Sequence, residues 1–268
     1  MKKVEEGAYK RIPFEILSHV TDFCENNDIR YSLYHGTLLG AIRHKGYIPW
    51  DDDIDIVMPR KDYEKFRKDY NSDKYPLIDL LSDDHYPIGV SKVYDPKTFY
   101  YFHNIFKRDI GLFIDVFVLD NVPDCIRTRN KWLRKILWLK RLNTWKNTKL
   151  HEFLQSSINW KWKVVIVLSR LLPISSHFLH IKIDALMRKY ESTECNFIGC
   201  PIDIRSHNNA FVCPKSYFED YVKIDFENNK FMATSHYDEV LQILYGDYMR
   251  LPPEHERVGK HGLTAYYK

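Results

Sequence analysis

Apolar residues near the start of the chain recur every three or four positions. Over residues 10–27 this spacing predicts an amphipathic helix that packs one face on a core. The next apolar stretch, 29–34, predicts a strand. Gly36 and Thr37 predict a turn, and a short helix is expected over 38–44. The chain should therefore begin with a helix, a strand and a second helix.

Residues 51–58 combine acidic and apolar side chains in a pattern typical of a buried strand. Four aspartates stand within five positions, and apolar residues alternate with the last of them and follow it. Successive side chains of a strand point to opposite faces, so Asp51, Asp53 and Asp55 should share one face, whereas Asp52 points the other way. Like charges on one face repel unless a cation neutralises them. A hard divalent ion fits best, Mg²⁺ above all and Mn²⁺ as the alternative.

The Gly36-Thr37 turn adds a second kind of site just upstream. A helix that opens on Gly-Thr presents free backbone N–H groups and a hydroxyl to an anion, most often phosphate. Gly36 also allows a ligand to approach the backbone closely. A phosphate cradle beside a two-carboxylate metal site is typical of phosphoryl or nucleotidyl transfer.

Helices and strands continue to alternate up to residue 120. A helix is predicted over 63–70, strand-like sequence covers 86–102, and another strand is predicted over 114–119. Asp120 falls just after that apolar run and is expected to be a turn or cap residue. Interleaved elements of both kinds indicate the α/β or the α+β class.

The composition changes sharply in the middle of the chain. Between positions 127 and 163, eleven Lys and Arg stand against one acid, and five of the six tryptophans lie there. The local net charge is therefore +10, which leaves −6 for the rest of a chain whose total is +4. We predict three parts: a core over 1–125, a helical insertion over 126–195, and a C-terminal part over 196–268 that completes the core.

One region resembles the LicD family, which shares a nucleotidyltransferase-type fold with the fukutin-related transferases. It consists of Tyr-His-Gly-Thr-Leu-Leu-Gly-Ala-Ile-Arg over 34–43 and Ile-Pro-Trp-Asp-Asp-Asp-Ile-Asp-Ile over 48–56. Residues 114–120 and 245–253, with a later His261, are also similar to that family. The resemblance leaves the middle of the chain undefined.

This resemblance implies an α+β fold, with a nucleotidyltransferase-like mixed β-sheet flanked by helices. It also implies Mg²⁺-dependent transfer of a phosphorylated alcohol from a cytidine-diphosphate (CDP) donor to a sugar hydroxyl, with release of CMP. Phosphocholine from CDP-choline is the leading donor, and enzymes for ribitol, glycerol, ethanolamine and aminoethylphosphonate analogues share the motif. Acceptors in the family are cell-surface glycans or their lipid-linked precursors, such as those of lipopolysaccharide, teichoic acid or capsule.

Three carboxylates are candidates for catalysis and metal binding. Asp53 and Asp55 are the best metal ligands, and in a site of this fold a third carboxylate comes from a neighbouring strand. Asp115 fits, because a charge inside an apolar run needs a partner. A metal-bound carboxylate beside the attacking hydroxyl can also accept its proton. The alternative for Asp115 is a strand-end carboxylate paired with a basic residue.

Four further residues are candidates for substrate binding, besides Gly36 and Thr37. Arg43 is predicted either to reach a phosphate or to lock the aspartate loop. Lys92 is either a phosphate ligand or a solvated lysine, and Trp50 either stacks on a base or seals the loop. His261 is a candidate because the family places the C-terminal region near the site.

Sequence features also bear on cellular location and on the cysteines. The N-terminus lacks the apolar run of a signal peptide, and no stretch reaches 18 apolar residues, so we expect a cytoplasmic protein. Five cysteines without a Cys-x-x-Cys pair are expected to be free thiols. Cys195, Cys200 and Cys213 with His207 fit no standard zinc spacing, and a zinc site there stays undecided.

Two other functions are compatible with parts of the chain. A nucleotidyltransferase would use a triphosphate to modify a small molecule and would release pyrophosphate instead of CMP. The basic, tryptophan-rich residues 127–163 are typical of nucleic-acid binding, but the clustered acids oppose a polyanion, so we expect no nucleic acid. The same segment instead predicts reversible binding to an anionic membrane surface.

Overall fold

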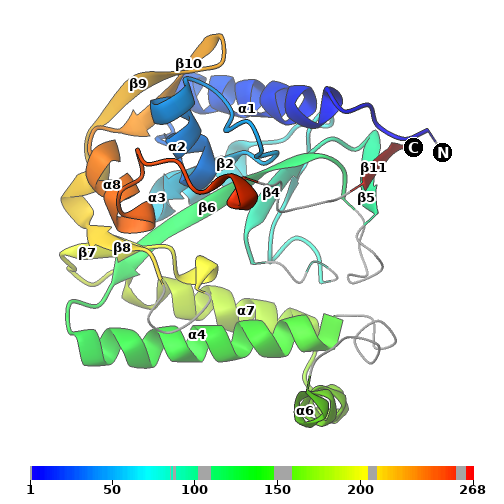
Figure 1. Ribbon diagram of the computed structural model, residues 1–268. Helices are drawn as coiled ribbons and strands as arrows, with labels where there is room; N and C mark the ends of the chain where they lie inside the picture. Colours follow the sequence, from blue (N-terminus) through cyan, green and yellow to red (C-terminus); the bar gives the residue numbers. More distant parts are fainter. Residues whose placement is uncertain are drawn as a thin grey trace.

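A seven-stranded mixed β-sheet forms the centre of the molecule (Figure 1). The computed structural model describes residues 2–84, 86, 89–101, 110–147, 159–204, 210–257 and 264–268. The strand order is β1-β2-β6-β4-β3, and β7 joins the far end of β6 to β8. These strands are β1 (Ser32–Leu33), β2 (Asp55–Pro59), β3 (Leu77–Ile78), β4 (Ser91–Tyr94), β6 (Phe113–Val122), β7 (Phe197–Gly199) and β8 (Val212–Pro214).

The two central strands, β2 and β6, run parallel, whereas the other pairs in this sheet are antiparallel. Parallel neighbours require a crossover connection, and here it contains α3 (Arg60–Asp69), β3 and β4. The register places Asp55 opposite Asp115 on one side and Lys92 opposite Asp115 on the other. A mixed sheet with surrounding helices confirms the predicted α+β class.

The remaining strands of the described residues form two small antiparallel sheets. One is the hairpin of β9 (Tyr221–Phe226) and β10 (Asn229–Thr234), and the other pairs β5 (Thr98–Tyr101) with β11 (Thr264–Tyr267). The backbone N–H of Tyr267 also donates to the carbonyl of Lys2, 2.9 Å away. The two ends of the chain therefore lie side by side (Figure 1).

Helix α1 (Ala8–Asn26) covers one face of the sheet (Figure 1). It confirms the helix predicted over 10–27. Six apolar positions carry that prediction: Phe23 is half-buried, and the other five are buried, namely Ile12, Ile16, Leu17, Val20 and Cys24. Helix α8 (Tyr237–Tyr245) ends before Gly246, whose positive φ of 68° is one that glycine adopts readily.

Helix α2 (His35–His44) begins earlier than the sequence suggested. Gly36 and Thr37 were expected to form a turn ahead of a helix over 38–44, but they lie in the first helical turn. Tyr34 is the extended residue at the N-cap, and its carbonyl accepts from the Leu38 backbone N–H at 3.0 Å. The chain therefore turns at Tyr34, and Gly36 and Thr37 belong to the N-terminus of the helix.

A layer of helices lies on the side of the sheet away from α1 (Figure 1). It consists of α4 (Ile126–Asn147), α6 (Trp160–Leu171) and α7 (Ser176–Met187). The indole of Trp132 on α4 donates to the carbonyl of Leu186 on α7 at 2.7 Å and meets the Tyr190 ring edge-on. These helices fall where helical structure was predicted, and the proposed boundaries of three parts stay a prediction. Single-turn 3-10 helices occur at Arg188–Tyr190, Pro201–Asp203, Lys215–Phe218 and Glu254–Glu256.

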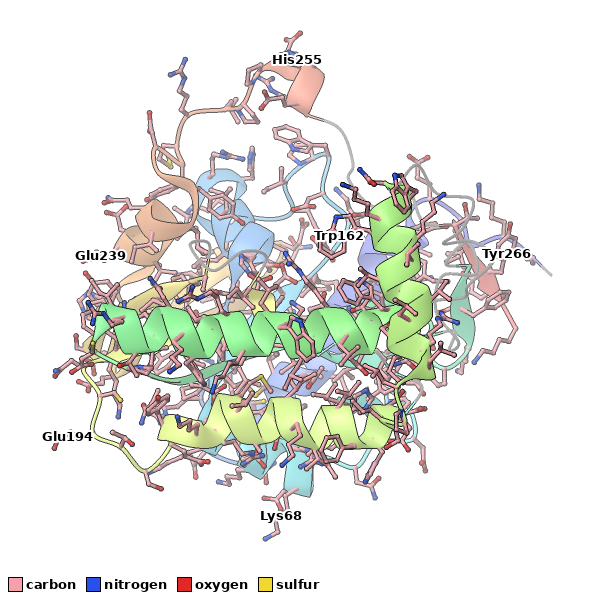
Figure 2. The ribbon with its side chains drawn as sticks, turned by 90° about the horizontal axis from the view of Figure 1, so that it is seen from below. Lys68, Trp162, Glu194, Glu239, His255 and Tyr266 are labelled. Atoms are coloured by element: carbon pink, nitrogen blue, oxygen red, sulfur yellow. The ribbon has the colours of Figure 1, made fainter. Side chains whose placement is uncertain are left out.

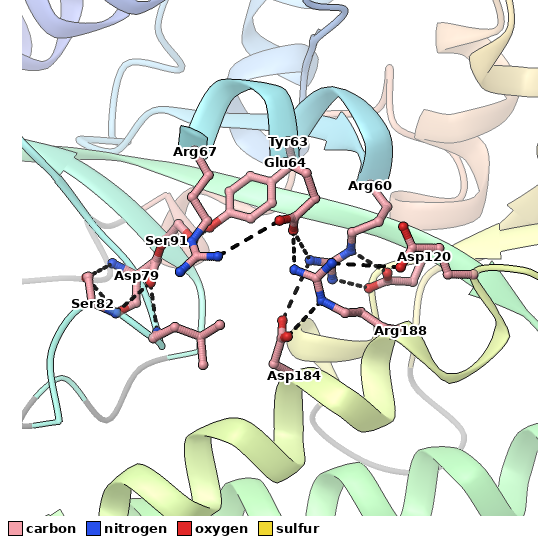
Figure 3. Close-up of polar contacts among 12 residues, drawn as sticks. Arg60, Tyr63, Glu64, Arg67, Asp79, Ser82, Ser91, Asp120, Asp184 and Arg188 are labelled. Atoms are coloured by element: carbon pink, nitrogen blue, oxygen red, sulfur yellow. Dashed lines mark hydrogen bonds and ion pairs between the residues drawn. The ribbon is translucent and has the colours of Figure 1, made fainter. Parts of the chain in front are cut away.

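A buried ion-pair network, which we call the Arg60 cluster, ties α3 and α7 to the end of β6 (Figure 3). The Arg60 guanidinium donates to both carboxylate oxygens of Asp120, at 2.7 and 2.8 Å, and to Glu64 at 3.1 Å. Arg188 donates to Asp184 at 2.7 Å and also pairs with Glu64. The prediction that Asp120 follows the strand was wrong. Pairing with β7 extends β6 beyond the apolar run and buries Asp120 within it.

All five cysteines lie in the described part of the chain and are free thiols, as predicted. Four of them are buried, and burial raises the pKa of Cys24, Cys200 and Cys213. His207, the fourth residue of the undecided zinc site, lies outside the described residues.

Candidate active site

An acidic cavity opens where β2 and β6 begin, beside the N-terminus of α2. Its volume is about 600 Å³, and its lining includes all three candidate metal ligands, Asp53, Asp55 and Asp115. Asp51 also lines it. Asp51, Asp53 and Asp55 therefore line the same cavity, as strand alternation predicted. Only Asp55 belongs to β2, and the preceding aspartates lie in the loop that leads into this strand. We call these four side chains the acid group.

Backbone contacts fix Asp55 and Asp115 side by side. The parallel register pairs them directly, and the Asp115 backbone N–H donates to the Ile54 carbonyl at 2.8 Å. The Asp55 backbone N–H donates to the Thr37 hydroxyl at 2.8 Å, and its carbonyl accepts from Tyr34 at 2.9 Å. Both ends of the peptide around Asp55 are thus held, one by α2 and one by the chain that leads into α2.

The charge on the Asp55 carboxylate is costly where it stands. Burial raises the pKa of Asp55 well above its usual range, and the neighbouring Asp53 and Asp115 raise it further. Lys92 lowers this pKa without offsetting the other effects. A cation bound beside Asp55 would favour the charged form of its carboxylate, so the acid group has the electrostatic character of a cation site.

Lys92 is one member of a buried ion pair. It lies on β4 opposite Asp115, its ammonium group binds the Asp115 carboxylate, and its Nζ sits 3.5 Å from the centre of the Phe113 ring. The alternative of a solvated lysine was wrong, because the β4–β6 pairing covers this position. The alternative to a metal role for Asp115 was a pair with a basic residue, and Lys92 is such a partner. A metal ion bound to Asp115 would therefore share this carboxylate with Lys92.

Gly36 is needed for the approach of an acid. A Cβ atom at this position would overlap the Asp51 carboxylate oxygen Oδ2. The Asp51 backbone N–H donates to the Ile48 carbonyl at 2.9 Å, which fixes the loop that brings it there. Gly36 therefore allows an aspartate to lie against the first turn of α2, the same close approach that was predicted for a phosphate.

Thr37 is buried, and its hydroxyl accepts from the Asp55 backbone. Sequence reasoning placed this hydroxyl on the donor phosphate. The structure shows it joining α2 to β2, which positions Asp55.

A second, larger cavity adjoins the acidic one. Its volume is about 800 Å³, and Gly36, Asp51 and Tyr245 line both. Arg43 lines it and donates to the Tyr248 carbonyl at 2.8 Å, so it holds the segment after α8. Trp50 lines it as well, with the Arg257 guanidinium 5.8 Å from its ring centre. His261, the remaining candidate, lies outside the described residues.

The structure adds one pair that sequence reasoning missed. His35 and Asp203 both line the acidic cavity, and Nε2 of His35 lies 3.2 Å from Oδ2 of Asp203. His35 also has a φ of +42°, in the left-handed region that non-glycine residues seldom occupy. No sequence pattern predicts this pair, because Asp203 lies far along the chain, in the 3-10 turn Pro201–Asp203. The only local signal is that His35 stands at the first position of α2.

The acid group fits a hard divalent cation by its chemistry. Its donors are carboxylate oxygens, which Mg²⁺ and Mn²⁺ prefer, and their accumulated charge calls for a cation. The arrangement is not closed: within the described ranges, no three His, Cys, Asp or Glu side chains converge as ligands of one ion. Binding an ion would therefore require Asp53, Asp55 and Asp115 to draw closer together.

Comparison with known proteins places the chain among transferases. Residues 28–141 match the family model described as "LicD/FKTN/FKRP, nucleotidyltransferase domain". The chain is 32% identical over 279 residues to the lipopolysaccharide cholinephosphotransferase LicD of Haemophilus influenzae, covering 99% of each chain. Shorter stretches match uncharacterized proteins of Rickettsia typhi (38% over 55 residues) and Rickettsia prowazekii (41% over 49 residues), covering 18% of each of those proteins.

Proposed function

Because this chain belongs to the LicD family, we propose that it transfers phosphocholine from CDP-choline to a sugar hydroxyl of lipopolysaccharide or its lipid-linked precursor. The observation that carries this proposal is the acid group, gathered in one cavity with the N-terminus of α2. The full-length similarity to a cholinephosphotransferase supports the choice of donor and acceptor. Ribitol, glycerol and ethanolamine remain alternative alcohols on the donor.

The reaction exchanges one phosphorus–oxygen bond for another. The acceptor hydroxyl oxygen bonds to the phosphorus that carries choline, and the bond from that phosphorus to the bridging oxygen of the pyrophosphate breaks. CMP leaves with the electron pair, and the hydroxyl proton passes to a carboxylate. Asp115 is our candidate for that base, because it lines the cavity and stands beside the buried Asp55.

The acid group would hold the divalent ion through Asp53, Asp55 and Asp115. When bound, Mg²⁺ or Mn²⁺ would neutralise the charge that develops on the transferred phosphoryl group. Lys92 would then share Asp115 with the ion or turn toward a donor phosphate. The chain's own part is to orient the donor and to keep the carboxylates in register.

The donor is proposed to lie across both cavities. Gly36 and Asp51 line each of them, so the pyrophosphate would sit where the two cavities meet, at the first turn of α2. The larger cavity offers Trp50 for stacking and three guanidinium groups, of Arg43, Arg250 and Arg257. This arrangement assigns the nucleotide to the larger cavity and the transferred group to the acidic one.

The test is product analysis with purified protein. Incubation with CDP-choline, Mg²⁺ and a lipopolysaccharide oligosaccharide should release CMP and add the mass of phosphocholine to the glycan, and EDTA should stop both. A panel of CDP-alcohols then identifies the donor. Asp52→Asn is a matched control, because Asp52 is the one aspartate of the run that does not line the acidic cavity. Release of pyrophosphate from a triphosphate, with no CMP from any CDP-alcohol, would instead establish a nucleotidyltransferase.

A further inference from the structure

Helix α6 exposes most of its apolar side chains. Among its residues only Ile166 and Ser169 are buried, whereas Trp160, Leu168 and Leu171 are 68%, 56% and 74% exposed. Val164, Val165 and Val167 are exposed as well. A helix on the surface of a globular protein normally turns its apolar side inward. Here Trp160, Val164, Leu168 and Leu171 form what we call the outer face of α6.

The outer face belongs to a helix that is docked on the rest of the protein. Trp162 packs on Trp145 of α4, with ring centres 5.9 Å apart, and the Arg170 guanidinium donates to the Trp145 carbonyl at 3.2 Å. Lys146 donates to the carbonyl of Leu172 at 3.0 Å. Figure 2 shows α6 lying across one end of α4, with Trp162 on the side toward α4. Figure 1 shows α6 beyond α4, on the side away from the sheet, and the residues of its outer face are exposed.

The sequence that carries this face has charges of one sign. From residue 153 to 183 it contains no Asp or Glu, and it contains Lys161, Lys163, Arg170 and Lys182. Asp84, from another part of the chain, binds His177 at the start of α7. An apolar helix face that carries tryptophan and lies in a stretch with only basic charged residues complements an anionic lipid surface. A second copy of this chain would bring four like charges together with four others, and a nucleic acid would gain nothing from the exposed leucines and valines.

The lengths of the helices favour lying on a bilayer over crossing it. No single helix in the described ranges is long and apolar enough to span a membrane. Trp160–Leu171 and Ser176–Tyr190 reach that criterion only as a pair, and they are bent by 102° at the break between them. The second of these helices adds two further exposed apolar side chains, Phe178 and Ile181.

We propose that the outer face of α6 docks the enzyme reversibly on an anionic lipid bilayer. The apolar side chains would enter the interface between headgroups and acyl chains, and Lys161 and Lys182, both exposed, would meet the headgroups. This goes beyond the proposed transfer reaction, since a soluble acceptor could be modified without it. A lipid-linked acceptor would be delivered to an enzyme held at the same surface.

Three residues of the segment 127–163, which composition predicts to bind a membrane, are used for contacts within the chain. Trp132 is buried between α4 and α7, Lys140 binds the carbonyls of Ile202 and Ile204, and Lys146 holds the end of α6. These basic residues stabilise contacts within the chain. Within the segment, Trp138 on α4 and Trp160 and Trp162 on α6 are exposed. The run of exposed apolar residues on α6 begins at Trp160 and continues past the predicted end of the segment.

The test is co-sedimentation with vesicles of phosphatidylcholine alone or mixed with phosphatidylglycerol. The wild-type protein should pellet with the anionic vesicles only, and less so at high salt. Leu168→Glu with Leu171→Glu should lower the partition coefficient by roughly tenfold or more, because two apolar side chains no longer enter the interface. Lys161→Gln with Lys182→Gln should lower it less and weaken the salt dependence.

Matched controls separate this effect from a general change of charge. Ile126→Glu with Val222→Glu changes two exposed apolar residues outside α6 and should bind as wild type does. Lys97→Gln with Lys230→Gln removes two charges from other surfaces and should also have no effect. Brominated phosphatidylglycerol should quench the tryptophan emission of the wild-type protein, a measurement that needs no variant.

Three results would overturn the proposal. Wild-type protein that stays in the supernatant at low salt, without quenching, does not bind lipid. Equal binding by the α6 variant and its control would place the contact elsewhere. A dimer that Leu168→Glu with Leu171→Glu dissociates, without any lipid binding, would show that a second copy covers the face. Transfer to a lipid-free oligosaccharide should be unchanged in this variant, so failure of the transferase assay and failure of lipid binding stay distinguishable.

Discussion

The two ends of strands β2 and β6 carry charged residues, and they are built in opposite ways. At one end Asp55 pairs in register with Asp115, next to further aspartates, and Lys92 binds the Asp115 carboxylate. At the other end, Arg60 follows β2 and binds Asp120 on β6. The two ends are separated by only a few residues of the same two strands, so the contrast does not come from the fold.

Each carboxylate of the Arg60 cluster meets a guanidinium group, whereas the acid group brings four carboxylates to one cavity. Burial alone would lower the pKa of Arg60, but the facing Asp120 outweighs this and raises it, so the guanidinium stays charged. Burial also raises the pKa of Asp120, and the charge and hydrogen bonds of Arg60 oppose that rise. At the other end, burial raises the pKa of Asp55 and the like charges of Asp53 and Asp115 raise it further, with only Lys92 among the main causes opposing them. Buried charges that are paired and hydrogen-bonded belong to the structure of a protein, and carboxylates with strongly raised pKa values in a cavity are characteristic of functional sites. The comparison therefore separates a structural network from the site that we propose to be catalytic.

The largest expected effect follows from removing a carboxylate of the acid group. Asp53→Asn and Asp55→Asn should each lower turnover by about 10²–10⁴-fold, because each removes a charged ligand that positions the ion and the donor. CMP release from CDP-choline with Mg²⁺ measures this, and Asp52→Asn should stay close to wild type. Near-normal turnover in either variant would remove that aspartate from the site.

The pH dependence of stability sharpens the same contrast without any substrate. Asp55 has a raised pKa in the folded state, so the unfolded chain loses this proton first as the pH rises above the ordinary value of 3.8. The unfolding free energy therefore falls as the pH rises from 3.8 to the folded-state pKa of Asp55. In metal-free protein, the unfolding free energy of Asp55→Asn should match that of wild type below about pH 3.8 and exceed it increasingly above. A constant difference across this range would contradict the assigned shift.

The next largest effect concerns the opposite end of the strands. Asp120→Asn should lower the unfolding free energy by about 3–5 kcal/mol, because it leaves Arg60 charged and buried with one strong partner fewer. Urea unfolding measures the loss, and turnover per folded molecule should remain near that of wild type. A large loss of turnover with intact stability would show that the two ends are functionally coupled.

The sequence predicted the acid group better than the Arg60 cluster, for a local reason. Strand alternation places Asp53 and Asp55 on one face, and the apolar neighbours of Asp115 mark a strand. Both signals lie within a few residues of the side chain concerned. Asp120 follows the last apolar residue of its run, so its place inside β6 depends on β7, a strand far along the chain.

Long-range register explains the other differences. Lys92 faces Asp115 because of the β4–β6 pairing, and His35 meets Asp203 because a distant 3-10 turn packs against α2. Thr37 could not be assigned to the Asp55 backbone until the position of α2 over β2 was known. Sequence pattern thus identified residues with chemistry, whereas the partner of each residue required the structure.

A smaller effect tests whether Asp115 is both a member of a structural ion pair and a catalytic residue. Repulsion among carboxylates alone would make Asp115→Asn stabilising, but Lys92 is buried and bound to this carboxylate. We therefore expect a loss of about 2–3 kcal/mol in unfolding free energy, less than for a fully buried pair, together with loss of turnover. Lys92→Met in the Asp115→Asn background should restore stability and leave the enzyme inactive. Restored turnover in the double variant would exclude Asp115 from catalysis.

The smallest effect concerns the contact that holds Asp55 in place. Thr37→Val keeps the shape of the side chain and removes the hydroxyl that accepts the Asp55 backbone N–H. A buried donor left without its partner costs about 1–2 kcal/mol of unfolding free energy. Turnover should fall by a smaller factor than in Asp55→Asn, because the carboxylate is retained but less firmly positioned. Thr37→Ser should recover both quantities, since it restores the acceptor. If Thr37→Val instead lowers the affinity for CDP-choline in calorimetry while stability stays unchanged, the hydroxyl binds the donor, and the acid group is held by the strands alone.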